Sequence, residues 1–166
     1  MKKETLALLL GYIANQEKEI DRLFEVIKCT EPTNNEKVVY LGYYLHNIYC
    51  AFEDMFKETV KAFENRIDDP SKYHRELLKR MVIEVPGIRP QFLSRASAEA
   101  LDELRSFRHM FRHSYMYKLD AERVKALKEK LLRSIVIVKS DIDRFTQFLR
   151  GKIDTSTEKR DGSTYF

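Results

Sequence analysis

Hydrophobic residues recur at three- and four-residue intervals in five stretches of the chain, and polar residues fill the positions between them. This spacing matches the helical period of about 3.6 residues, so each stretch predicts an amphipathic helix with one apolar face. The first expected helix begins at residue 6 and ends by Glu31-Pro32, and the second covers about 34–64. The third begins near Ser71, continues through Met81 and is closed by Pro86-Gly87. The fourth begins at Ser94 or Ser97 and continues to about Tyr115, and the fifth covers 120–151. The pattern therefore predicts an all-α protein, built as an antiparallel helical bundle of about five helices.

Capping residues mark the starts of three expected helices. The caps are Thr33 for the second helix, Ser94 or Ser97 for the fourth, and Asp120 for the fifth. Glu36 completes a capping box with Thr33. Glu99 is expected in the first turn of the fourth helix, where the helix dipole favours an acidic side chain.

The apolar period ends at Gly151, and the residues after it are mainly small or polar. We expect residues 1–151 to form one helical bundle domain and residues 152–166 to form a flexible C-terminal tail. Composition agrees with this division, because only five Gly and four Pro occur among 166 residues, which disfavours a turn-rich β fold.

The charge and the cysteine content limit the kinds of binding partner and the cellular compartment that we expect for the protein. The chain has 30 Lys and Arg residues and 26 Asp and Glu residues, and its net charge of +4 permits a polyanionic partner. Cys29 and Cys50 both fall in apolar-periodic segments, as buried reduced thiols of cytosolic proteins do. The longest apolar run, at residues 6–10, is too short to span a membrane. We therefore expect a cytoplasmic protein with no membrane partner.

The fourth expected helix concentrates the candidate chemistry. Its cationic residues are Arg105, Arg108, His109, Arg112 and His113. On a helix, Arg108 shares the flank of the inward apolar stripe, and the others turn progressively away from it. Arginine can hold phosphate oxygens and stabilise the charge that develops on them, and histidine can move protons near neutral pH. The cluster therefore suits a phosphodiester, and we expect neither a metal nor a cofactor.

Arg108 and His113 lie five positions apart, which separates them by about 140° around a regular helix. A joint site needs either a distorted helix end or a second copy of the helix across a two-fold axis. We favour the second arrangement, a homodimer. Two alternatives stay open here: a run of Arg and His is commonly a solvated face, and His109 with His113 has the spacing of a zinc-binding pair, although the neighbouring cations oppose metal binding.

Arg108, His113 and Tyr115 form an Arg-x4-His-x-Tyr pattern. This pattern resembles the signature of the HepT group in the HEPN superfamily, whose members are all-α and often dimeric, metal-independent ribonucleases. The flanking stretches that are similar to the same group are residues 44–49, 52–53, 74–78, 84–90 and 101–104. The resemblance covers most of residues 5–150 and implies an HEPN-like bundle.

The resemblance implies roles for three residues, and a fourth residue departs from the family pattern. Arg108 and His113 take the catalytic places, with His113 as general acid or base and Arg108 as the stabiliser of the phosphorane charge. Tyr115 matches the tyrosine that a partner nucleotidyltransferase antitoxin of the MntA type modifies with AMP in some members. His109 departs from the family, in which Asn is common at this position.

The remaining charged residues complete the expected site. Arg105, His109 and Arg112 are assigned to the RNA backbone, because phosphate contacts supply affinity rather than sequence choice. Glu53 is expected to pair with an arginine of the fourth helix, and His74 to orient a neighbouring group. We therefore expect a metal-independent ribonuclease toxin of a HEPN/nucleotidyltransferase toxin–antitoxin module, which cleaves RNA in a groove at the dimer interface. The alternative is a non-catalytic HEPN-like module that binds a nucleotide or a nucleotidyltransferase.

Overall fold

The structure, a computed structural model, describes residues 2–64, 73–112 and 119–161, and gives the backbone alone at 73–74 and 156–161. The described residues form five helices and no strand. These helices are α1 (Lys3–Cys29), α2 (Asn35–Phe63), α3 (Tyr73–Met81), α4 (Arg95–Arg112) and α5 (Ala121–Asp161). The prediction of an all-α bundle of five helices is confirmed.

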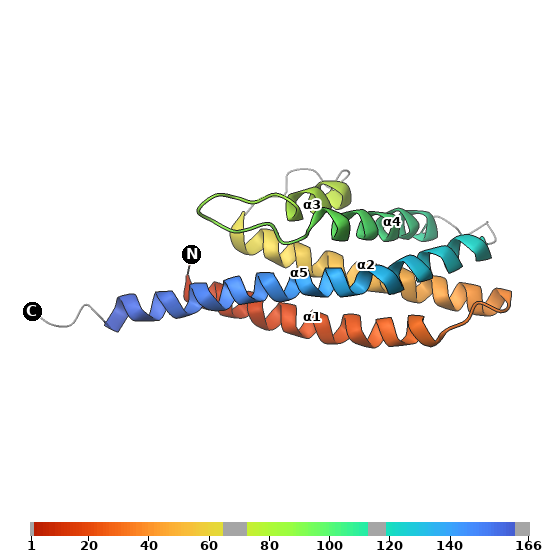
Figure 1. The fold of residues 1–166 in the computed structure, drawn as a ribbon, viewed down its shortest axis with the longest axis horizontal. Coiled ribbons are helices and arrows are strands. Elements are labelled where there is room, and N and C mark those ends of the chain that lie inside the picture. The colour runs from red at the N-terminus through yellow and green to blue at the C-terminus, as the bar shows by residue number, and fades with distance from the viewer. Residues whose placement is uncertain (1, 65–72, 113–118, 162–166) are drawn as a thin grey trace, which may run out of the picture.

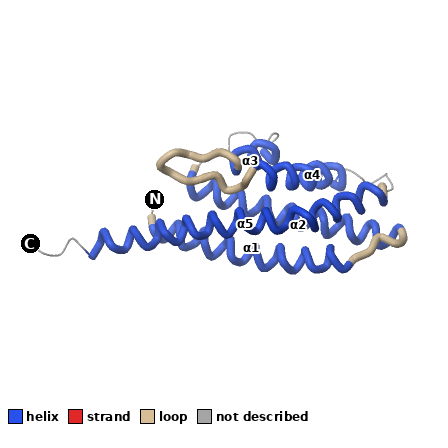
Figure 2. The backbone as a smooth tube through the Cα atoms, in the orientation of Figure 1, coloured by secondary structure: helices blue, strands red, loops and turns tan. Residues whose placement is uncertain are grey.

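The helices lie roughly along the long axis of the molecule and are stacked in three levels across it (Figure 1). Helices α2 and α5 occupy the middle, α1 packs against both on one side, and α3 and α4 lie on the other side. The chain reverses direction between α1 and α2 and again between α4 and α5, so these neighbours are antiparallel (Figure 2). Helix α4 also runs antiparallel to α2, which it contacts along its length.

The apolar faces predicted from the sequence meet in one continuous core. Part of this core is aromatic: the ring centroid of Phe92 lies 5.4 Å from that of Phe56 on α2 and 4.3 Å from that of Phe145 on α5. Phe92 belongs to the loop between α3 and α4, and its backbone N–H donates to the carbonyl of Met81. The loop is therefore part of the core rather than a solvated connection.

A buried arginine holds the same loop in place. The Arg89 side chain is almost fully buried and forms an ion pair with Glu64 at the end of α2. Its guanidinium also donates to the backbone carbonyls of Ile83, Pro90 and Arg80. Because its donors find acceptors, the buried charge is compensated.

The cap of α2 differs from the sequence prediction. Asn34 has extended backbone angles, and its side-chain oxygen accepts from the backbone N–H of Lys37 at 2.9 Å. Thr33, which was predicted to be the cap, lies one residue before this position, so the prediction was wrong by one residue. An asparagine and a threonine are both good caps, and the backbone angles decide between them.

The caps of α4 and α5 lie close to where they were predicted. The Ser94 hydroxyl accepts from the backbone N–H of Ser97 at 3.3 Å, which selects Ser94 of the two candidate serines. The Asp120 carboxylate accepts from the backbone N–H of Glu122 at 3.0 Å, as expected. The first turn of α4 holds no acidic residue, so Glu99 lies beyond it and the prediction for Glu99 was wrong.

Helix α5 continues past its predicted end. The helix runs through Gly151 to Asp161. A glycine ends a helix when its backbone adopts a left-handed conformation, and among the described glycines only Gly87 has a positive φ, at 75°. The division into a 1–151 domain and a 152–166 tail stays a prediction.

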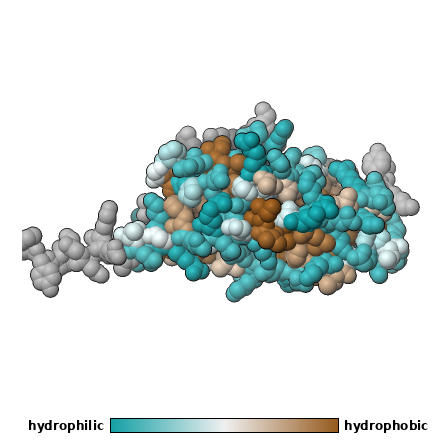
Figure 3. Space-filling view, in the orientation of Figure 1, coloured by the Kyte–Doolittle hydropathy of each residue, from teal (hydrophilic) through white to brown (hydrophobic). Residues whose placement is uncertain are grey.

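The surface corrects the prediction for the cysteines. Cys29 is the last residue of α1 and is exposed, whereas Cys50 on α2 is half-buried, and both are free thiols. The viewed face is largely polar, with an apolar patch over the middle of α5, where Val136 and Ile137 are exposed (Figure 3). Within the described ranges, no helix combines the length and apolar character needed to cross a membrane.

Candidate functional site

A glycine on α2 sets the approach of α4. A Cβ atom added at Gly42 would lie 3.2 Å from the ring of Phe111, 3.4 Å from that of Phe107 and 3.1 Å from the Leu119 side chain. Contacts this short require the neighbours to move. The missing side chain therefore lets the C-terminal half of α4 lie close against α2, within reach of polar groups there.

Three arginines follow one flank of α4. Arg105, Arg108 and Arg112 have the i, i+3, i+7 spacing that places side chains on one helix face. Their exposure rises away from the core: the Arg108 side chain is 12% exposed, that of Arg105 is 21% exposed, and Arg112 is exposed. Arg108 is therefore the member of the row that faces α2.

The facing side of α2 carries a matching row of polar groups. His46, Cys50 and Glu53 have the i, i+4, i+7 spacing of one helix face. The Nε atom of Arg108 donates to Cys50 Sγ at 3.4 Å, and its Nη2 atom lies 3.4 Å from Glu53 Oε2. The Glu53 side chain is only 1% exposed and also accepts from Lys57 Nζ at 3.1 Å. The ion pair is the pairing with an α4 arginine that was expected for Glu53.

Among the described residues, these contacts leave one end of the Arg108 guanidinium for a ligand. A guanidinium has five N–H groups, and the contacts with Cys50 and Glu53 engage the edge formed by Nε and Nη2. The end formed by Nη1 and the second proton of Nη2 has the fork geometry that binds phosphate in a bidentate manner. Burial lowers the pKa of Arg108, but the Cys50 hydrogen bond and the Glu53 charge outweigh it and raise the pKa overall, so the group stays charged.

His46 is a site residue that the sequence analysis did not identify. Its ring stacks on Phe111, with centroids 5.4 Å apart and planes at 27°, and its Nε2 atom lies 3.7 Å from Cys50 Sγ. The Nδ1 atom is buried and has no hydrogen-bond partner among the described residues. Burial lowers the pKa of His46, and the charges of Arg108 and Arg112 lower it further against the opposing effect of Glu53.

The spacing to Glu53 could have identified His46 and Cys50. Once Glu53 is expected to face α4, the residues three and seven positions before it are its neighbours on the same face of α2. Apolar periodicity conceals this, because a thiol and an imidazole can both pass as packing groups.

The outer residues of α4 form a cationic surface. Arg105 Nε donates to Asp102 at 2.7 Å, so one of its contacts is already taken by an acidic neighbour. His109 and Arg112 are exposed, in agreement with the direction predicted for them. Their contact with RNA stays a prediction.

Three predicted site residues fall outside this description. His113 and Tyr115 lie outside the described residues, as does the side chain of His74, whose backbone belongs to α3. In the part of the chain that is described, no group of three or more His, Cys, Asp or Glu side chains is arranged to hold a metal ion.

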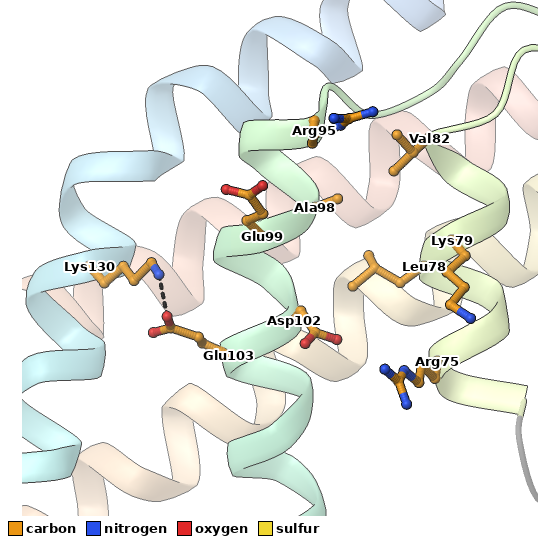
Figure 4. A pocket seen from close by; sticks show the side chains of 10 residues that line it. All are labelled: Arg75, Leu78, Lys79, Val82, Arg95, Ala98, Glu99, Asp102, Glu103 and Lys130. Atoms are coloured by element: carbon orange, nitrogen blue, oxygen red, sulfur yellow. Dashed lines mark hydrogen bonds and ion pairs between the residues drawn. The ribbon is translucent and has the colours of Figure 1, made fainter.

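A separate cavity of about 540 Å³ lies between α3, α4 and α5 (Figure 4). Its α3 wall is basic, with Arg75 and Lys79, and its α4 wall is acidic, with Glu99 and Asp102. The ion pair between Lys130 and Glu103 closes one side. The lining residues are Arg75, Leu78, Lys79, Val82, Arg95, Ala98, Glu99, Asp102, Glu103 and Lys130. Because acidic groups line the cavity, it is a poorer anion site than the Arg108 row.

Comparison with known proteins gives one informative result. The family described as HepT-like protein matches residues 40–149. The match includes His46, Cys50, Glu53 and Arg108, and therefore the whole contact between α2 and α4 described above. Neither the curated proteins nor the solved structures contain a match to the chain.

The lowered pKa of His46 predicts a pH dependence of stability. In the unfolded chain the pKa of the His46 imidazole is near 6.5, and in the folded protein this pKa is lower. Below about pH 6.5 the unfolded chain therefore binds more protons, and the free energy of unfolding falls as the pH falls. Urea unfolding at pH 7.5 and 5.5 should show a larger acid loss for the wild type than for His46→Gln. An equal loss in both proteins would contradict the assignment.

Proposed function

The chain belongs to the HepT-like family, and from this premise we propose that it is a metal-independent ribonuclease that cleaves RNA in a groove at the interface of a homodimer. The observation that carries the proposal is Arg108, a charged guanidinium that Glu53 and Cys50 hold along one edge, with no contact at its forked end within residues 2–64, 73–112 and 119–161. Such a group suits a phosphodiester, which offers paired oxygens and develops further negative charge during cleavage.

The reaction requires a stabilised phosphorane anion and two proton transfers. The ribose 2′-oxygen loses its proton as it forms a bond to phosphorus, and the 5′-oxygen gains a proton as its bond to phosphorus breaks. Arg108 stabilises the charge on the phosphorane, and His113 acts as general acid or base at the 2′-hydroxyl or at the leaving oxygen. This assignment of His113 rests on the Arg-x4-His-x-Tyr pattern.

The partly or fully exposed cations of α4 extend the site along the RNA backbone. Arg105, His109 and Arg112 border Arg108 and offer sequence-independent phosphate contacts. Affinity of this kind decreases as the salt concentration rises, because RNA binding releases counterions. His74 has a supporting role in this proposal.

The wider assignment is a toxin of a toxin–antitoxin module that acts in the cytoplasm. The partner is a nucleotidyltransferase antitoxin of the MntA type, which would transfer AMP to Tyr115. The modification adds bulk and negative charge two residues from His113, which opposes binding of an RNA backbone. The family match supports this context at the level of the family.

Substitution of the two catalytic residues tests the activity. We expect Arg108→Ala and His113→Ala each to reduce the cleavage rate of a fluorescent RNA by about 100-fold or more, as typical losses of a charge stabiliser or a general acid–base predict. The matched control is Arg133→Ala, an exposed arginine on α5, which should cleave at the wild-type rate. A wild-type protein that binds RNA without cleaving it would instead establish the non-catalytic binding module.

The homodimer has its own test. If each groove takes Arg108 from one protomer and His113 from the other, a heterodimer of Arg108→Ala and His113→Ala contains one intact pair. After subunit exchange, the mixture of inactive variants should recover up to about a quarter of the wild-type activity, because half of the dimers carry one intact groove of two. Light scattering that finds only monomers, or a mixture without activity, would refute the composite groove.

A further inference from the structure

A chain of polar contacts runs from the proposed catalytic arginine into α2. Arg108 Nε contacts Cys50 Sγ at 3.4 Å, and Cys50 Sγ lies 3.7 Å from His46 Nε2. We propose that Cys50 and His46 form a positioning pair for Arg108, which fixes the plane of its guanidinium so that the forked end faces the RNA phosphate. The identity of the ligand, an RNA phosphate, rests on the proposed function. The positioning of Arg108 rests on the contacts alone.

The Cys50 thiol supplies the second contact that is needed to fix the orientation of the planar Arg108 guanidinium. The contact between Nη2 and Glu53 Oε2 holds the guanidinium at one position, about which the plane can still turn. The Nε atom carries a single proton, and Cys50 Sγ is the acceptor that the structure places for it. With both contacts made, the edge formed by Nε and Nη2 is fixed against α2 and the opposite end points away from it.

His46 fixes the thiol in turn. A thiol can accept one hydrogen bond and donate another, so with Arg108 Nε–H as donor the S–H of Cys50 is free to donate to His46 Nε2. A neutral imidazole has one acceptor nitrogen, and this arrangement places its proton on Nδ1, which is buried and has no acceptor among the described residues. The stack on Phe111 holds the ring in the required plane.

The surroundings of His46 favour the neutral form that this arrangement needs. The charged groups around the ring are Arg108 and Arg112 on α4 and Glu53 on α2, and Cys50 lies against its Nε2 atom. Burial and the two arginines oppose protonation, and Glu53 only partly offsets them. Protonation would turn Nε2 into a donor and remove the acceptor for the thiol.

Plain packing is the competing explanation. Cysteine often behaves as a small apolar side chain, and an imidazole can fill space between helices. Packing depends on size, whereas the positioning pair depends on donor and acceptor capacity. Two matched pairs of substitutions separate these properties: Cys50→Ser against Cys50→Ala, and His46→Gln against His46→Leu.

The first readout follows the arginine itself. The NMR signal of the Arg108 Nε–H group, assigned through Arg108→Lys, should exchange slowly with water in the wild type and in Cys50→Ser. It should exchange several-fold faster in Cys50→Ala and in His46→Leu, with thermal unfolding as the check that each variant is folded. Equal exchange in the serine and alanine variants would overturn the positioning pair.

The second readout follows the ligand. Fluorescence anisotropy with a labelled RNA on the non-cleaving His113→Ala background should show about 3- to 10-fold weaker binding for Cys50→Ala, the range expected for one hydrogen bond, and a smaller loss for Cys50→Ser. His46→Gln, whose amide oxygen can accept from the thiol, should bind better than His46→Leu. In an Arg108→Lys background, Cys50→Ala should have no further effect; an undiminished effect there would overturn the proposal.

The exchange and RNA measurements together distinguish a failure of the positioning pair from a failure of the proposed function. A wild-type protein without RNA cleavage refutes the ribonuclease, while the exchange of the Arg108 signal still decides whether Cys50 and His46 hold the guanidinium. Conversely, normal cleavage together with unchanged exchange in Cys50→Ala refutes the positioning pair and leaves the ribonuclease standing.

Discussion

The carboxylate of Glu53 is buried between two helices, and the arrangement of the site depends on how its charge is compensated. Removing a carboxylate from water costs on the order of several kcal/mol unless cations and hydrogen bonds replace the lost solvation. Glu53 is 1% exposed and has Lys57 from its own helix and Arg108 from α4 within 3.4 Å. The requirement to neutralise this charge therefore fixes an arginine of α4 against α2, in a position where it remains partly accessible.

The packing around this ion pair makes the contact possible. Gly42 allows the aromatic side chains of α4 to approach α2 closely, and Phe111 then stacks on His46. Apolar contacts set the distance between α2 and α4. At this distance the polar row on α2 can contact and orient the guanidinium of Arg108. The outer arginines of α4 lack this constraint and remain on the surface, where they suit contacts with an extended anion.

Much of the fold follows from the sequence because helical periodicity and capping chemistry are local. The apolar spacing located five helices, and Asp120 and Ser94 cap helices as their side chains predict. Local signals failed where backbone angles decide the outcome, as for Thr33 and for the continuation of α5 through Gly151. The exposure of Cys29 was missed because an apolar-periodic segment does not reveal which way its last residue faces.

The site, like the fold, has a part that the sequence predicts and a part that depends on packing between helices. The cationic row of α4 and the pairing of Glu53 could be predicted, because charge and helical spacing are visible in the sequence. The spacing to Glu53 could have placed His46 and Cys50 on the same face of α2. Their contacts with Arg108 could not be predicted from that spacing, because they depend on how α2 packs against α4.

The position of Arg108 relative to a bound RNA phosphate can be observed in a crystal structure of the protein with an RNA oligonucleotide whose 2′-hydroxyls are methylated, so that it cannot be cleaved. We expect a phosphate oxygen within hydrogen-bonding distance of the Nη1 and Nη2 end of Arg108, with the contacts to Cys50 and Glu53 retained. An oligonucleotide bound in the cavity between α3 and α4, or an Arg108 that leaves Glu53 to reach the phosphate, would contradict this expectation.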